Sequence, residues 1–137
     1  MIEVSVSVAI AASAERVWSI MGGFDFLPRW LNMVISSELS DGGRVRRLVT
    51  SNGATIVERL LEFSQSEYRY SYAHLDSPDP VSGYVGVMSV RDEEGGAVAT
   101  WSSSFNPIGI SPTEAVARYE TVYREGLAAL KQLIEQG

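Results

Sequence analysis

The sequence contains no cysteine and a single histidine, His74, among its 137 residues. Without cysteine there is no disulfide framework, no thiolate nucleophile and no thiolate metal site. A single histidine also excludes the imidazole clusters that hold many metal ions in proteins. We therefore expect no metal site, and no motif in the chain indicates a cofactor.

Positive charge is scarce as well, since 11 Lys and Arg stand against 17 Asp and Glu and the formal net charge is −6. The basic surface that binds nucleic acids and anionic membranes is missing, so neither is an expected partner. No apolar run approaches the length of a bilayer span, and we expect no membrane insertion. The sequence indicates no particular oligomeric state.

The first ten residues alternate between apolar and polar or small side chains from Ile2 to Ile10. This period of two is typical of a half-buried strand. The segment carries Glu3 and lacks the basic residues that precede the apolar part of a secretion signal. We therefore predict a strand here and a cytoplasmic protein.

The spacing changes to a helical period after Ser13, which is a suitable N-cap for a short helix that ends at Gly22-Gly23. A brief helical piece or turn is expected around Pro28. Residues 33–106 then show short strand-like runs. Five turn segments separate these runs: 41–43, 51–53, 64–66, 76–80 and 93–96.

A helical stripe runs along the last part of the chain, from Ser111-Pro112 onward. It consists of Val116, Tyr119, Tyr123, Leu127, Leu130 and Ile134. A sheet of about seven strands must curl, and this helix is the element large enough to cover its concave face. We predict one α+β domain over residues 1–137, with a curved antiparallel sheet wrapped around the long C-terminal helix and two short helices after the first strand.

The stretch "YRYSYAH" places Tyr70, Tyr72 and His74 on one face of a predicted strand, because successive side chains alternate between faces. Tyrosine and histidine seek hydrogen-bond partners when they are buried, whereas leucine or valine would fill a plain core without that need. We therefore predict that this face is the polar wall of a pocket. The alternative is an ordinary aromatic core, with His74 satisfied by a neighbour.

The hairpin around Asn52-Gly53 predicts a second part of the pocket. A loop of two or four residues would pair Arg47 with Glu58 and turn the apolar face of Val45 and Val49 inward. The charged pair would then either contact a ligand or merely neutralise itself within the core.

Several stretches together resemble the Bet v 1-like, START-related superfamily, and within it the bacterial polyketide cyclase/dehydrase-like group. They are "ASAERVWSIMGGFDFLPRW", "VRRLVTSNGATIVERLLEF", "YSYAHLDSPDPVSGYVGVMSV", "ATWSSSF" and "YREGLAALKQLIEQ". The resemblance covers nearly the whole chain and implies a helix-grip fold. In this fold a curved sheet grips a long helix, and a cavity lies where the two do not quite meet.

The resemblance also implies roles for individual residues. Glu58 in "ERL" resembles a pocket residue of the plant abscisic-acid receptors, and the same likeness turns Tyr72, His74, Tyr84 and Gly86 inward. Leu31 stands where those receptors have an anchoring lysine, which argues against a carboxylate ligand.

The predicted function is the binding of a small, mostly hydrophobic molecule, similar to a lipid, a polyketide or an aromatic compound. The candidate ligand-binding residues are Arg47, Glu58, Tyr70, Tyr72, His74, Tyr84, Gly86, Trp101, Tyr119 and Tyr123. Two alternatives remain open: an enzyme similar to a polyketide cyclase/dehydrase, and an interaction or co-chaperone-like protein whose cavity is incidental. The sequence contains no specific catalytic motif.

Overall fold

The computed structural model describes residues 1–137 and contains one sheet and three α-helices. The chain order is β1 (Ile2–Ile10), α1 (Ala14–Met21), α2 (Leu27–Trp30), β2 (Val34–Ser40), the 3₁₀ turn η1 (Asp41–Gly43), β3 (Val45–Thr50), β4 (Thr55–Ser64), β5 (Arg69–Asp76), β6 (Val81–Glu93), β7 (Gly96–Pro107) and α3 (Pro112–Gln136). This order confirms the predicted succession of elements. No helix combines the length and the apolar character that a membrane span requires.

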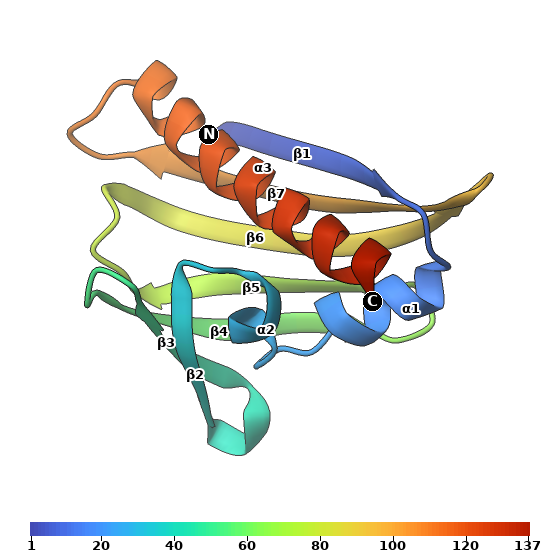
Figure 1. Cartoon of the computed structure of the whole chain (residues 1–137). Coiled ribbons are helices and arrows are strands. Elements are labelled where there is room, and N and C mark those ends of the chain that lie inside the picture. The colour runs from blue at the N-terminus through green and yellow to red at the C-terminus, as the bar shows by residue number, and fades with distance from the viewer.

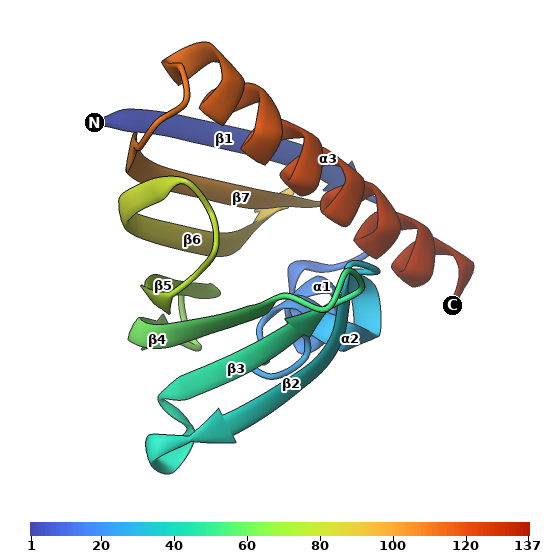
Figure 2. The ribbon, with the colours of Figure 1, turned by 90° about the vertical axis from the view of Figure 1, so that its left-hand side faces the viewer.

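The seven strands form one antiparallel sheet in the order β1-β7-β6-β5-β4-β3-β2. The first and second strands are therefore the two edges, and the helices α1 and α2 carry the chain from one edge to the other. The sheet curls strongly between the β1 and β7 side and the β2 and β3 side (Figure 2). The long helix α3 lies across its concave face, so the helix-grip prediction is confirmed (Figure 1).

Local sequence signals explain where the helices begin. The Ser13 hydroxyl accepts a hydrogen bond from the Arg16 backbone N–H, and the Ser111 hydroxyl accepts one from that of Glu114. Both serines are N-caps that satisfy a backbone donor of the first turn. Pro112 follows at the first position of α3, where its missing N–H has no cost.

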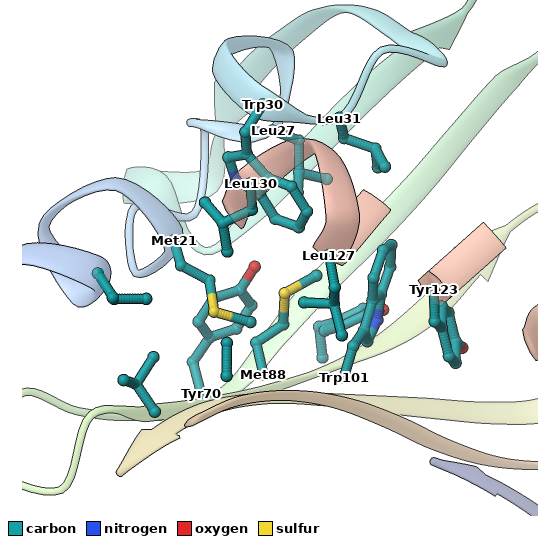
Figure 3. Packing of buried hydrophobic residues seen from close by; sticks show 14 of the residues in the cluster. Met21, Leu27, Trp30, Leu31, Tyr70, Met88, Trp101, Tyr123, Leu127 and Leu130 are labelled. Carbon is teal, nitrogen blue, oxygen red and sulfur yellow. The ribbon is translucent and has the colours of Figure 1, made fainter. Parts of the chain in front are cut away.

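The core lies between α3 and the inner face of the sheet. Side chains of α3 such as Tyr123, Leu127 and Leu130 meet Trp101 and Met88 of the sheet (Figure 3). Gly126 lies within this contact, because an added Cβ would come within 2.8 Å of Leu31 Cδ1 and 3.0 Å of Trp101 Cζ3. The glycine therefore permits the close approach of helix and sheet.

Candidate functional site

A pocket of about 130 Å³ lies between α3 and the inner face of the curled sheet. Hydrophobic residues make up 12 of its 18 lining residues. The volume is below the roughly 300 Å³ at which pockets for drug-sized ligands begin, and is comparable to the cavity of about 150 Å³ that binds benzene in another protein. Large aromatic side chains have filled most of the space between helix and sheet.

Seven of the ten residues proposed from the sequence line this pocket. They are Glu58, Tyr72, His74, Tyr84, Trp101, Tyr119 and Tyr123. The other three, Arg47, Tyr70 and Gly86, do not line it.

Arg46 replaces Arg47 as the partner of Glu58, so the predicted pairing was wrong. The strand register places Arg46 opposite Glu58 and Arg47 opposite Val57. Arg47 is exposed, and the inward face of β3 carries Arg46, Leu48 and Thr50 rather than the valines.

The length of the hairpin loop is the cause of this error. The Thr50 N–H donates to the Ala54 carbonyl, which leaves three residues, 51–53, in the loop. Gly53 at the third position has φ +85°, as the common three-residue hairpin loop requires. A change of one residue in register turns every side chain of a strand to the opposite face.

Arg46 and Glu58 form a buried ion pair, with side chains only 1% and 6% exposed. Glu58 Oε1 accepts from Arg46 Nε at 2.8 Å and lies 2.8 Å from Nη2. Burial alone would raise the pKa of Glu58, but the Arg46 charge and the hydrogen bond from His74 outweigh it and hold the pKa below its usual value. Glu58 is therefore an anion at neutral pH.

The two N–H groups of Arg46 Nη1 are also occupied. Nη1 donates to the Phe24 carbonyl at 2.8 Å and to the Tyr70 hydroxyl at 3.1 Å. The guanidinium carbon lies 4.2 Å from the centre of the Phe24 ring and 4.8 Å from that of Tyr72, which adds cation–π attraction. Tyr70 therefore supports Arg46 from behind the pocket wall.

His74 joins the pair on the pocket side. Its Nε2 lies 3.3 Å from Glu58 Oε2, and its ring stacks on Tyr84 with centroids 3.9 Å apart. A histidine held by a carboxylate in a pocket wall is an arrangement that can exchange a proton with a bound molecule.

Trp101, Ser103 and three tyrosine hydroxyls form a hydrogen-bonded chain beside this group. The Trp101 indole N–H donates to the Tyr72 hydroxyl at 2.9 Å, which lies 3.0 Å from that of Tyr84. Tyr84 is bonded in turn to Tyr123, whose hydroxyl donates to Ser103 at 2.7 Å. Burial raises the pKa of Tyr72 and Tyr84 well above the usual value, so both remain uncharged.

Gly86 lies on the inner face of β6 next to these hydroxyls, but it does not line the pocket. A Cβ added to Gly86 would come within 2.2 Å of Tyr72 Cζ, so the glycine makes room for the Tyr72 ring. Its contribution to the pocket is therefore indirect.

Asp79 and Arg118 are lining residues that the sequence did not suggest. Asp79 accepts from the Tyr119 hydroxyl at 2.7 Å and from Arg118 Nη2 at 3.1 Å, which ties the β5–β6 loop to α3. The Arg118 side chain is 51% exposed, so this contact lies at the pocket's outer end. The sequence signal was faint, because Asp79 sits in a turn and Arg118 beside the helical stripe.

Apart from Arg46 and Thr50 of β3, the remaining lining residues are apolar and come from α2, the following loop, β2, β3, β4 and α3. They include Leu27, Leu31, Met33, Leu48, Ile56 and Val122. The structure brings together no group of three or more His, Cys, Asp or Glu side chains that could hold a metal ion.

Comparisons with known proteins agree with this architecture. A family model described as polyketide cyclase/dehydrase and lipid transport matches residues 1–135. The protein XoxI from Bacillus cereus is 38% identical with a TM-score of 0.96, and the match covers 98% of this chain and 96% of XoxI. An uncharacterized protein from Bacillus thuringiensis is 37% identical with a TM-score of 0.94, over 97% of this chain and 98% of that one.

A more distant match shares the fold alone. The di-domain ARO/CYC protein BexL, from the BE-7585A biosynthetic pathway, is 21% identical with a TM-score of 0.84. The match covers 98% of this chain and 47% of BexL. The comparison with curated proteins gave no match.

Proposed function

Because the chain belongs to the polyketide cyclase/dehydrase and lipid transport family, we propose that it binds a small, mostly hydrophobic molecule in the pocket between the sheet and α3. The observation that carries this proposal is the composition of the wall, in which aromatic and aliphatic side chains surround a few polar groups that already have partners. Pockets of this kind bind their ligands through apolar contact and use polar groups for orientation.

The volume of the pocket indicates the size of the ligand. About 130 Å³ accepts a molecule with a single ring, with part of it extending toward Asp79 and Arg118. A longer lipid or polyketide chain requires additional space. A neighbouring hollow of about 110 Å³ shares Leu31, Met33 and Val122 with the pocket, and movement of these side chains would join the two.

Calorimetric titration with the neutral single-ring molecules indole and benzamide tests the proposal. We expect saturable binding with a stoichiometry of one. Val122→Phe narrows the pocket and should weaken binding at least about tenfold, equivalent to roughly 1.4 kcal/mol. Val87→Phe is the matched control, because Val87 is also half-buried but lies between inward-facing Gly86 and Met88 and so points to the outer face.

Two results would contradict this function. One is weak, non-saturable binding of both probes to the unmodified protein. The other is an equal effect of the two phenylalanine variants, because binding would then not depend on the pocket.

A second candidate function is an enzyme similar to a polyketide cyclase/dehydrase. The contact between His74 and Glu58 in the pocket wall favours it, because such reactions require a group that removes or returns a proton. Product analysis after incubation with a poly-ketone substrate distinguishes this candidate from binding alone. Turnover that is lost in His74→Gln, while indole binding is retained, would establish it.

A further inference from the structure

The carboxylate of Glu58 occupies the place that an acidic ligand would take in this pocket. Both Glu58 and Arg46 line the pocket, and Arg46 presents Nε and Nη2 to the same carboxylate oxygen at 2.8 Å. Proteins bind the carboxylates of their ligands with this type of charge-assisted contact. Here the contact is made within the chain.

Most donors of Arg46 are already engaged, and only one N–H of Nη2 has no partner within the chain. Nη1 is engaged by the Phe24 carbonyl and the Tyr70 hydroxyl, and aromatic rings lie against the guanidinium. An anion that entered the pocket would have to displace Glu58 or lie beside its negative charge in a site of low dielectric.

The second cation of the pocket is paired as well. Arg118 contacts Asp79 at the outer end, where solvent reaches the arginine and weakens its field. His74 is directed to Glu58 through Nε2. The two arginines and two carboxylates that line the pocket therefore balance.

We infer that Glu58 is an internal counter-ion that determines specificity: by holding Arg46 it makes the pocket select uncharged molecules over carboxylates of the same shape. The inference rests on the proposed function, since it describes what the pocket accepts. In this role Glu58 discriminates between charged and uncharged ligands without having to contact the ligand in the unmodified protein.

Benzamide and benzoate form a suitable pair of probes, because they share one ring and nearly the same shape but differ in charge. At about pH 8, where an ordinary carboxylic acid is ionised, the unmodified protein should bind benzamide at least about tenfold more tightly than benzoate. Glu58→Ala frees Arg46 and opens space beside it. In this variant benzoate should bind at least about tenfold more tightly than in the unmodified protein, while benzamide should not gain comparably.

Two further variants separate the charge effect from other causes. The double variant Arg46→Met/Glu58→Leu has no guanidinium and should gain no affinity for benzoate. Glu62→Ala removes an exposed carboxylate from the same strand and should leave the preference for benzamide unchanged.

Thermal unfolding provides a second readout. Acetate at high concentration should raise the Tm of Glu58→Ala by several degrees relative to the same concentration of sodium chloride, because acetate fills the place of the lost carboxylate. The unmodified protein should show no such difference. If Glu58→Ala does not fold, Glu58→Gln keeps a neutral group of the same shape. This variant should show a smaller gain in benzoate affinity and a smaller rise in Tm with acetate.

The outcomes also separate this inference from the proposed function. Equal affinity of the unmodified protein for benzoate and benzamide would overturn the counter-ion role, and so would the absence of any gain for carboxylates in both Glu58 variants. If indole and benzamide fail to bind the unmodified protein but acetate stabilises Glu58→Ala, the proposed function fails while the counter-ion role stands.

Discussion

Removing either partner of the buried pair between Arg46 and Glu58 should destabilise the fold strongly. In Glu58→Leu the guanidinium loses two charge-assisted contacts at 2.8 Å, each of which contributes about 1.5–3 kcal/mol. In Arg46→Met the carboxylate is left with His74, and the Phe24 carbonyl loses its arginine donor. Each single variant should lose about 3–5 kcal/mol, which is typical when one member of a buried pair is removed.

The double variant Arg46→Met/Glu58→Leu should lose much less than the sum of the two. It has no stranded charge, and what remains is mainly the unpaired Phe24 carbonyl and Tyr70 hydroxyl, each at a cost of about 1–3 kcal/mol. The coupling free energy in the double-mutant cycle should therefore be at least about 3 kcal/mol.

Urea unfolding of the four proteins measures these free energies. The matched control is the exposed pair Arg59–Asp41, whose side chains are 43% and 58% exposed at a distance of 3.1 Å, and whose coupling should stay below about 1 kcal/mol. Additive losses in the Arg46 and Glu58 cycle would refute the structural argument, because they would show that the two charges do not depend on each other.

Two further predictions follow from the same core. Because the pKa of Glu58 is lower in the folded protein than in the unfolded chain, its contribution to stability is complete above about pH 5 and is lost as the pH falls through the folded value. Unfolding free energies should therefore decrease on acidification more steeply in the unmodified protein than in Glu58→Gln, and parallel curves would contradict this. Gly126→Ala should cost about 1–2 kcal/mol in urea unfolding despite the higher helix propensity of alanine, because the new methyl group meets Leu31 and Trp101. A more stable variant would show that this side of α3 has room.

The order of the elements could be predicted because each one carries its own local signal. Ser13 and Ser111 mark helix starts, the alternation after Ile2 marks a strand, and the stripe on α3 marks the face that meets the sheet. Such signals depend on a few neighbouring residues, and the long-range packing did not override them here.

The pairing of β3 with β4 could not be predicted in the same way. The segment "VRRLVT" offers a valine face with Arg47 and a mixed face with Arg46, and because each face contains one arginine the pattern does not decide which one is buried. Which face is buried depends on whether the loop at Asn52 has two residues or three, and Gly53 is compatible with both loop lengths. A loop that is longer by one residue thus places Arg46 rather than Arg47 at the pocket.

The aromatic face of β5 shows a different limit of sequence reasoning. The alternation placed Tyr70, Tyr72 and His74 together, and they do point to the inner side of the sheet. The pocket reaches only part of this face, so that Tyr72 and His74 line it while Tyr70 lies behind Arg46. Periodicity predicts on which face of the sheet a side chain lies, but not whether that side chain reaches the pocket.

The hydrogen-bonded chain that begins at Trp101 has a direction that is set at its other end, where Tyr123 donates to Ser103. An indole N–H can only donate, so the Tyr72 oxygen accepts and its own hydrogen is free to point onward to Tyr84. Tyr84 is bonded to Tyr123, and Tyr123 donates its only hydrogen to Ser103. Since each tyrosine has a single O–H, the donation from Tyr123 to Ser103 requires Tyr84 to donate to Tyr123 and Tyr72 to donate to Tyr84. The hydroxyls of β5, β6 and α3 therefore form one ordered arrangement that starts and ends on β7.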